Sequence, residues 1–234
     1  MKPIYVPKGK AKEYGDLALN IYTGCPHRCY YCFAPNVLHR DREKFHSCVE
    51  PRPNIVEETR KQIEREGITD KIIHLCFTCD PYPTGYDTTV TREIIKVIKE
   101  SGNHVQILTK GSGARDFDLL DENDWYGITI TGALTSQKVV SATESERMFD
   151  LLRAKSRGIK TWVSFEPVLN AEAVLECISA TYEWFDKVKI GKLNYYPSDI
   201  DWKKFGEEAE SLCKTLGLDY YIKDSLLAEM EKGE

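Results

Sequence analysis

Six short apolar segments, each followed by a helical pattern, restrict this chain to a small set of folds. The segments expected to form strands are residues 17–21, 71–78, 105–109, 125–131, 159–165 and 188–191. Strands that alternate with helices pair in parallel, because each helix returns the chain to the same edge of the sheet. Such a sheet either stays open and doubly wound or curls into a barrel with its helices outside. In both architectures the functional residues lie at the carboxyl ends of the strands.

Capping residues predict where several helices begin. Asn54 with Glu57, and Thr143 with Glu146, have the spacing of a capping box, and Asn170 is placed to cap a further helix. Other helices are expected at residues 89–101, 116–122 and 202–216, and a short terminal strand at residues 218–222.

The length of 234 residues allows one large α/β domain. We expect an N-terminal arm at residues 1–16, a core at residues 17–194, and a C-terminal extension of helix and strand, residues 195–234, packed on the core. The arm is rich in lysine, proline and glycine, so we expect it to bury little and to drape over the domain. A formal net charge of −5 argues against general attraction to nucleic acid, although a local basic patch would be enough for binding.

Two observations bear on location. No apolar run reaches the roughly 20 residues that span a bilayer, and the first residues lack the apolar core of a signal peptide. We therefore expect a cytoplasmic protein with no membrane partner. In that compartment the eight cysteines are thiols or metal ligands more often than disulfides.

Three of these cysteines are closely spaced directly after the first expected strand. Cys25, Cys29 and Cys32 have the pattern C-x3-C-x2-C. Thiolates are the ligands of iron–sulfur clusters, and three of them leave one iron of a [4Fe–4S] cluster open to a small molecule. The alternative is a non-catalytic zinc-binding module in which His27 or His39 completes the ligand set, since zinc accepts the same types of ligand.

Polar side chains recur at the ends of the later strands. The candidate residues at this level are Cys79, Lys110, Thr129, Thr131, Ser164, Glu166 and Asn194. Because side chains alternate along a strand, Thr129 shares a face with Thr131, and Ser164 with Glu166. If these faces point into a barrel, its mouth can hold a zwitterionic cofactor with a ribose. Glu166 is our candidate for the ribose hydroxyls, since a carboxylate accepts two hydrogen bonds well.

These motifs resemble those of a known family. The three cysteines, with an aromatic residue before the last one, are similar to the signature of the radical S-adenosylmethionine (radical SAM) superfamily. The stretches Thr78-Cys79-Asp80-Pro81-Tyr82 and Leu108-Thr109-Lys110 resemble its spore photoproduct lyase-like branch. The resemblance extends over residues 17–194 and implies a partial (β/α)6 barrel of the TIM type, with parallel strands inside and helices outside.

The resemblance implies specific roles for the candidate residues. Cys25, Cys29 and Cys32 would hold a [4Fe–4S] cluster, and S-adenosylmethionine would bind the open iron through its amino and carboxylate groups. Lys110 would neutralise that carboxylate, and Thr129 would bind the methionine end. Tyr31 would contact adenine, and Thr131, Ser164 and Asn194 complete the expected cofactor-binding set. An electron donor such as flavodoxin or ferredoxin would reduce the cluster.

The implied reaction is reductive cleavage of S-adenosylmethionine to a 5′-deoxyadenosyl radical that abstracts hydrogen from a substrate. The branch suggests a nucleobase or nucleotide in nucleic acid, and modification of a peptide or small metabolite stays open. Phe77 stands where spore photoproduct lyase has a hydrogen-donor cysteine. By strand alternation Cys79 lies on the same face as Phe77, so Cys79 is our candidate hydrogen donor. A basic edge beside the cysteines could meet phosphates, and it consists of Arg28, His39, Arg40, Arg42 and Lys44.

Overall fold

The protein is described here by a computed structural model that covers residues 2–133 and 140–232; residues 1, 233 and 234, at the ends of the expected arm and extension, lie outside it. One eight-stranded sheet forms its centre, and the strands are hydrogen-bonded in sequence order. The strands are β1 (Ile4–Tyr5), β2 (Leu17–Leu19), β3 (Ile72–Leu75), β4 (His104–Thr109), β5 (Trp125–Thr129), β6 (Lys160–Phe165), β7 (Lys187–Ile190) and β8 (Asp219–Ile222). β1 runs antiparallel to β2, and the other pairs are parallel. This confirms the expected α/β fold with parallel strands.

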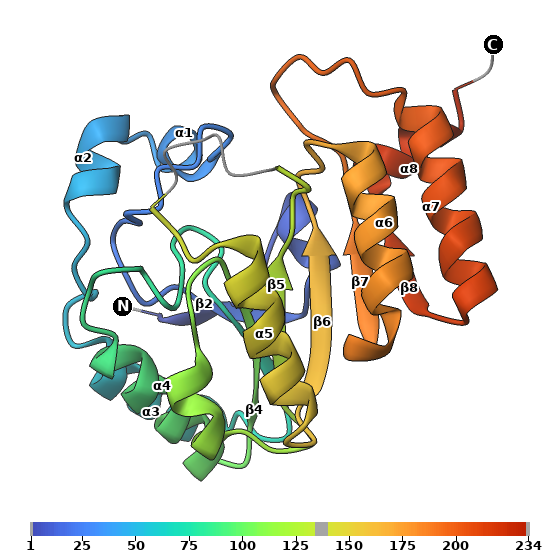
Figure 1. Ribbon diagram of the computed structural model, residues 1–234. Coiled ribbons are helices and arrows are strands. Elements are labelled where there is room, and N and C mark those ends of the chain that lie inside the picture. The colour runs from blue at the N-terminus through green and yellow to red at the C-terminus, as the bar shows by residue number, and fades with distance from the viewer. Residues whose placement is uncertain (1, 134–139, 233–234) are drawn as a thin grey trace.

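Helices surround the sheet: α1 and α2 lie beyond its strand ends, and the longer helices cover its outer face (Figure 1). They are α1 (Ala34–Val37), α2 (Arg42–Ser47), α3 (Ile55–Glu66), α4 (Thr89–Glu100), α5 (Glu144–Lys155), α6 (Ala171–Thr181), α7 (Trp202–Leu216) and α8 (Asp224–Met230). Short 3-10 helices lie at Gly9–Glu13, Ala114–Leu119 and Tyr182–Trp184. The arrow of β6 points toward the end of the molecule where α1 and α2 lie, so both helices sit at the carboxyl ends of the strands.

The two faces of the curled sheet differ in chemistry. Outward-facing strand residues such as Ile107, Ile128 and Val163 are fully buried under the helices and form the apolar core. The inner face instead carries aromatic and polar side chains. Trp162, for example, lies across Gly127 of the neighbouring strand, where an added Cβ would come within 2.1 Å of the indole nitrogen. The apolar core therefore lies between sheet and helices, which leaves the inner face free for polar groups.

The N-terminal residues are more buried than their composition suggests. Ile4 is 1 % exposed and pairs with Leu19, and its backbone exchanges two hydrogen bonds of 2.8 Å with the Gln62 side chain. Tyr14 packs on the inner face of the sheet, with ring centroids 5.6 Å from His74 and 5.9 Å from Trp162. The arm therefore fills part of the barrel interior, because tertiary contacts supply the apolar and aromatic partners that its own sequence lacks.

Most helix boundaries agree with the capping residues, with two exceptions. Thr143 and Glu146 form the predicted capping box, and the Asn170 side chain accepts a hydrogen bond from Ala173. Asn54 makes no side-chain cap, because its backbone is left-handed (φ 52°), a conformation that asparagine tolerates. The helix expected at residues 116–122 is a 3-10 turn that begins earlier, at Ala114.

Candidate active site

The three cysteines of the C-x3-C-x2-C motif lie in the loop between β2 and α1. Cys29 is buried, and Cys25 and Cys32 are half-buried. Burial raises the pKa of the Cys25 thiol well above its usual range and also raises the pKa of Cys32. Both thiols are therefore protonated at neutral pH without a metal, and metal binding would have to release those protons.

His27 is not available as a fourth ligand. Its Nε2 accepts a hydrogen bond of 3.1 Å from the Thr84 backbone N–H, and its Nδ1 lies 3.5 Å from the Asp80 carboxylate. Burial lowers the pKa of His27, so its ring stays neutral and joins the cysteine loop to the loop after β3. Both ring nitrogens are thus engaged within the protein.

The donor set fits an iron–sulfur cluster better than a single zinc ion. Among the described residues, the one group of three such side chains whose ligand atoms all lie within 4.8 Å of one another is His104, Asp121 and Asp124. The three cysteine sulfurs therefore do not all lie within 4.8 Å of one another. Zinc holds sulfur ligands at about 2.3 Å, which places them about 4 Å apart. The three thiols therefore do not form a preset tetrahedral zinc site.

Asp80 connects two of the sequence motifs. Its buried carboxylate accepts hydrogen bonds from Thr109 Oγ1 at 2.5 Å, from the backbone N–H of Lys110 at 2.8 Å and from that of Tyr82 at 2.9 Å. The loop after β3 and the end of β4 are therefore held together by one side chain. Gly111 allows this close approach, since a Cβ there would lie 2.0 Å from the Tyr82 carbonyl oxygen. The carboxylate thus fixes the backbone from which Lys110 projects.

Three predicted cofactor-binding residues lie close together at the ends of β4 and β5. The Lys110 ammonium donates to Thr129 Oγ1 at 3.4 Å and lies 5.8 Å from the centre of the Tyr31 ring. Thr131 lies two residues beyond the end of β5, and both its N–H and its hydroxyl donate to Glu144, at 2.7 and 2.8 Å. Sequence position alone did not indicate this use of Thr131.

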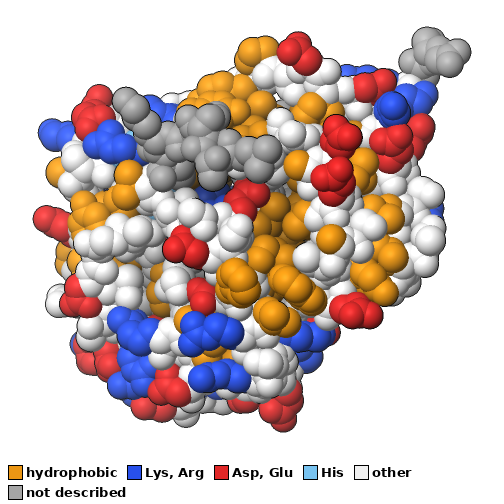
Figure 2. Space-filling view, in the orientation of Figure 1, with side chains coloured by type: hydrophobic (Ala, Val, Ile, Leu, Met, Phe, Trp, Pro, Cys, Tyr) orange, Lys and Arg blue, Asp and Glu red, His pale blue; other side chains and the backbone are white. Residues whose placement is uncertain are grey.

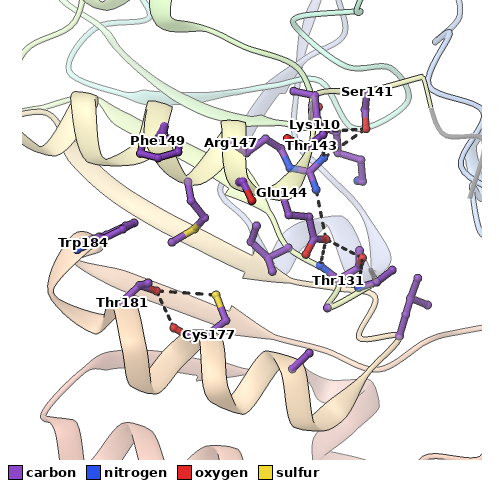
Figure 3. A pocket seen from close by; sticks show the side chains of 18 of the residues that line it. Lys110, Thr131, Ser141, Thr143, Glu144, Arg147, Phe149, Cys177, Thr181 and Trp184 are labelled. Carbon is purple, nitrogen blue, oxygen red and sulfur yellow. Dashed lines mark hydrogen bonds and ion pairs between the residues drawn. The ribbon is translucent and has the colours of Figure 1, made fainter. Parts of the chain in front are cut away.

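A cavity of about 610 Å³ adjoins these residues. Lys110, Thr131 and Arg147 lie at one end of it, and Cys177 and Trp184 lie at the other, between α5 and α6 (Figure 3). Figure 2 shows hydrophobic side chains over α5 and in the hollow between the two helices. The cavity is large enough for a nucleoside-sized cofactor, since ligand pockets typically measure about 300–1,000 Å³.

Ser164 and Glu166 meet the N-terminal arm rather than open space. The Tyr14 hydroxyl donates to Glu166 Oε2 at 2.7 Å and lies 3.3 Å from Ser164 Oγ. Burial, together with the Glu166 carboxylate, raises the pKa of Tyr14 well above its usual range, so the phenol keeps its proton. Lys223 donates to the same Glu166 oxygen at 2.5 Å and lies 3.1 Å from Glu13. The orientation of Glu166 is therefore set by residues outside the expected core.

The arm also reaches Asn194. Lys10 donates to Asn194 Oδ1 at 2.7 Å, and the Asn194 amide donates to the Lys192 carbonyl at 3.1 Å. Glu13 accepts hydrogen bonds from Tyr221 and from the backbone N–H of Asp224. In the described chain no ladder joins β1 to β8, and these contacts bridge the open side of the partial barrel.

Cys79 does not share an environment with Phe77, in contrast to the expectation from strand alternation. Phe77 stacks on His74 with ring centroids 4.3 Å apart, on the inner face of the sheet. Cys79 instead packs against the apolar core, where its sulfur accepts a hydrogen bond of 3.4 Å from the Tyr22 backbone. The regular alternation fails because the strand ends at Leu75 and Cys76 is left-handed (φ 70°). A hydrogen-donor role for Cys79 remains a prediction.

The expected basic edge is largely used within the protein. Arg28 forms two hydrogen bonds with Glu43, at 2.5 and 2.8 Å, and Arg40 donates to the Thr23 carbonyl. Lys44 lies on the exposed side of α2. These contacts leave less positive charge for phosphate groups than the sequence indicates.

The sequence analysis did not identify Tyr14 and Lys223 as residues that contact Glu166 in the site. Lys223 directly follows β8, so counting the terminal strand as part of the barrel would have placed it beside Glu166. Tyr14 carries no such signal, because nothing in its local sequence specifies the inner face of the sheet.

Comparison with known proteins identifies the family. The model of the radical SAM superfamily matches residues 19–184, and the chain belongs to this superfamily. The family implies a [4Fe–4S] cluster and S-adenosylmethionine as cofactors, and its members need a reductant. The chain is also 27 % identical over 197 residues to "Uncharacterized protein ORF301" of Acidianus two-tailed virus, covering 76 % of this chain and 65 % of that protein. It thus spans just under two thirds of the length of that relative.

Solved structures show the same fold at low sequence identity. A doubly substituted spore photoproduct lyase with bound AdoMet and dinucleoside spore photoproduct matches with a TM-score of 0.70 and 12 % identity, over 93 % of this chain and 79 % of that one. SuiB of Streptococcus suis, bound to its precursor peptide SuiA, matches with a TM-score of 0.67 and 12 % identity, over 91 % and 50 %. A radical SAM methyltransferase from Sphaerobacter thermophilus matches with a TM-score of 0.58 and 13 % identity, over 88 % and 65 %. These likenesses confirm the partial barrel of the radical SAM core.

Proposed function

We propose that this protein is a radical SAM enzyme in which Cys25, Cys29 and Cys32 hold the [4Fe–4S] cluster, and that it acts on a nucleobase or nucleotide in nucleic acid. The observation that carries the cofactor assignment is the set of three free thiols in one loop, from which His27 is withheld by Asp80 and Thr84. When bound, the two cofactors supply reductive cleavage chemistry that starts hydrogen abstraction from the substrate.

The side chains around the mouth would bind and orient S-adenosylmethionine. Lys110 offers a cation for the carboxylate, and Thr129 offers a hydroxyl group for the methionine end. Thr131 completes the proposed cofactor-binding set, with its hydroxyl held by Glu144. Ser164 and Glu166 are assigned to the ribose, and Tyr31 and Asn194 to the adenine side. Tyr14 and Lys223 both donate to Glu166 Oε2, so the ribose hydroxyls are assigned to Glu166 Oε1.

Residues from distant loops would exclude water from the reaction. The Tyr196 hydroxyl donates to the Tyr30 carbonyl at 2.7 Å, and the two rings lie 5.5 Å apart in an edge-to-face arrangement. The loop after β7 therefore touches the cysteine loop across the mouth. Shielding of this kind is required because a reactive intermediate would otherwise be quenched by solvent or side reactions.

Exposed aromatic side chains at the mouth support a nucleobase as the substrate group. Tyr195 is 82 % exposed, Phe33 is 46 % exposed and Tyr30 is 37 % exposed. The Lys10 ammonium lies 5.3 Å from the centre of the Tyr195 ring and could meet a phosphate. Aromatic rings stack on bases with little sequence preference, and nearby cations meet the backbone. A cavity of about 440 Å³ between Tyr30 and the loop of Leu193 to Ile200 adds room for a base.

The location and the reductant belong to the same proposal. None of the described helices is long and apolar enough to cross a membrane. We propose a cytoplasmic enzyme with flavodoxin or ferredoxin as electron donor, because a cluster with an exposed iron needs a reducing compartment.

Cofactor chemistry is tested first. The protein is purified without oxygen, reconstituted with iron and sulfide and reduced, and 5′-deoxyadenosine formed from S-adenosylmethionine is measured. We expect a coloured protein and formation of this product. A colourless protein with tightly held zinc and no 5′-deoxyadenosine would refute the enzyme assignment in favour of a zinc-binding module.

Substrate class is tested by binding a fluorescent single-stranded oligonucleotide to the reconstituted protein. Tyr195→Ala should weaken binding about tenfold, because stacking contributes about 1–3 kcal/mol per base. The matched control is Trp125→Ala, which removes a half-buried aromatic ring from the first residue of β5, at the end of the strands opposite the mouth. Equal affinity of the wild type and Tyr195→Ala, or no binding at low salt, would contradict a nucleic-acid substrate and leave peptides and small metabolites.

A further inference from the structure

Helix α2 packs directly behind the cysteine loop and contacts it through one arginine. Arg42 Nη2 donates to the Cys29 carbonyl at 2.6 Å and to the Tyr30 carbonyl at 2.7 Å. Arg42 Nη1 donates to the Cys32 carbonyl at 3.2 Å. One planar guanidinium group therefore gathers three carbonyl groups of the loop, which a single ammonium group cannot match in geometry.

A histidine one turn later holds the remaining cysteine. His46 Nδ1 lies 2.7 Å from the Cys25 carbonyl oxygen, and because that oxygen can only accept, Nδ1 carries the hydrogen. His46 is 4 % exposed. The backbone N–H of Cys25 also donates to the Phe45 carbonyl at 3.2 Å. Gly24 makes the approach possible, since a Cβ there would lie 2.3 Å from that same carbonyl oxygen.

The two side chains act from one face of a short helix. Positions 42 and 46 are four residues apart and therefore share a helix face. A six-residue helix has little stability of its own, and α2 is fixed by the Asp41 cap, which accepts from the Lys44 N–H at 2.8 Å, and by the fully buried Phe45 ring. The neighbouring acid, Glu43, pairs with Arg28 instead of Arg42.

We propose that Arg42 and His46 are positioning residues that preset the cysteine loop for the cluster, and that the charge of Arg42 stabilises the reduced cluster. The inference rests on the proposed role of the three cysteines. Preset carbonyl groups reduce the conformational entropy that the loop must lose on binding the cluster. A fixed cation beside an anionic cluster favours the more negative, reduced form, because net charge in the surroundings is one determinant of cluster potential.

The test uses reconstituted, oxygen-free protein and compares Arg42→Gln, Arg42→Lys, His46→Asn and His46→Gln with the wild type. Lys44→Gln is the control, because it removes an exposed charge from the same helix. The measurements are the rate of iron loss to a chelator, the midpoint potential of the cluster and its electron paramagnetic resonance spectrum after reduction. Urea unfolding of each apoprotein reports on the fold.

We expect Arg42→Gln to lose iron at least about tenfold faster and to have a more negative midpoint potential, since both the hydrogen bonds and the charge are removed. Arg42→Lys should lose iron faster but keep a potential close to the wild type. His46→Asn should behave like the wild type, because the asparagine amide can donate from the position of Nδ1, whereas His46→Gln should lose iron faster. If Arg42→Gln does not fold, the iron-loss rate of Arg42→Lys tests the inference, and a rate equal to that of the wild type would overturn it.

The inference would be overturned if Arg42→Gln lost iron at a rate within twofold of the wild type and had the same midpoint potential within error. A Lys44→Gln effect equal to that of Arg42→Gln would overturn it as well, since a nonspecific surface charge would then be responsible. If the wild type itself takes up no cluster, the proposed function fails before the variants are compared. The two failures are therefore distinguishable.

Discussion

The two sides of the barrel mouth are built in different ways. The cysteine side is assembled from one contiguous stretch, in which Arg42 and His46 contact the loop that ends only ten residues before α2 begins. The opposite side joins three distant segments, which contribute Tyr14, Glu166 and Lys223. The cysteine side relies on hydrogen bonds to backbone carbonyls, and the opposite side relies on a buried ionic network.

This difference determines what each side depends on. A local loop with backbone contacts can be preset before the whole barrel is complete, because its loop-closure cost is small. The Glu166 side requires the finished tertiary structure, because Tyr14 and Lys223 reach it from opposite ends of the chain. We therefore expect changes on the cysteine side to act on the cluster, and changes on the Glu166 side to act on the stability of the fold.

The largest effect is expected from removing a cysteine on the cysteine side of the mouth. Cys29→Ala should abolish cluster binding completely, because two thiolates cannot replace three in holding the cluster. The visible absorbance and the iron content of the reconstituted protein report this loss. Cys213→Ala is the control, since it removes a fully buried thiol from α7. An intact cluster in Cys29→Ala would show that Cys29 is not a cluster ligand.

The second prediction concerns the ionic network on the Glu166 side. Lys223, which is 2 % exposed, neutralises Glu13 and Glu166, so Lys223→Met should lower the free energy of unfolding by about 3–5 kcal/mol. The urea midpoint of the apoprotein measures the change. Lys61→Met serves as control, because it removes an exposed partner of Glu57 and should cost no more than about 1 kcal/mol. Equal effects of both substitutions would show that the network contributes little to stability.

The third prediction concerns the pH dependence of stability, which we expect to depend on His74 in the buried interior of the barrel. Burial, with a smaller contribution from the Lys189 charge, lowers the pKa of His74 to about 3. Between pH 6.5 and 3 the unfolded chain then binds more protons at this residue than the folded chain, so stability falls as the pH is lowered. His74→Gln should reduce that fall by about 1–3 kcal/mol.

Urea unfolding of the apoprotein at pH 6.5 and pH 4 provides the measurement for His74→Gln. The matched control is His39→Gln, since His39 is exposed. If the wild type and His74→Gln lose the same stability between these two pH values, His74 is not kept neutral by burial.

The smallest effect is expected at the exposed rim of the cysteine side. Arg28 and Glu43 form a surface pair, with 41 % and 71 % of their side chains exposed. Arg28→Gln should leave the urea midpoint of the apoprotein and the cluster content of the reconstituted protein unchanged, because solvent screens an exposed ion pair. A marked loss of cluster in Arg28→Gln would mean that the rim, and not only α2, fixes the loop.

Local sequence patterns predicted much of the fold and part of the site. Thr143 and Glu146 form the expected capping box, since both partners lie within one turn and need no tertiary contact. Lys110 and Thr129 were placed together from strand order, and their side chains meet at 3.4 Å. The pattern was wrong for Cys79, because alternation holds only within a regular strand and the backbone leaves the strand after Leu75.

The sequence by itself determined the alternation of strands and helices, the spacing of three thiols in one loop and the polar residues at the strand ends. Each of these depends on local periodicity or on neighbours a few residues apart, which the order of residues encodes directly. Only the tertiary structure decided that Tyr14 enters the barrel, that Lys223 takes one oxygen of Glu166, and that α2 holds the carbonyl groups of the cysteine loop. The first two contacts join side chains that become neighbours only when the sheet curls. The third depends on how α2 packs against the loop, which the periodicity of the sequence does not specify.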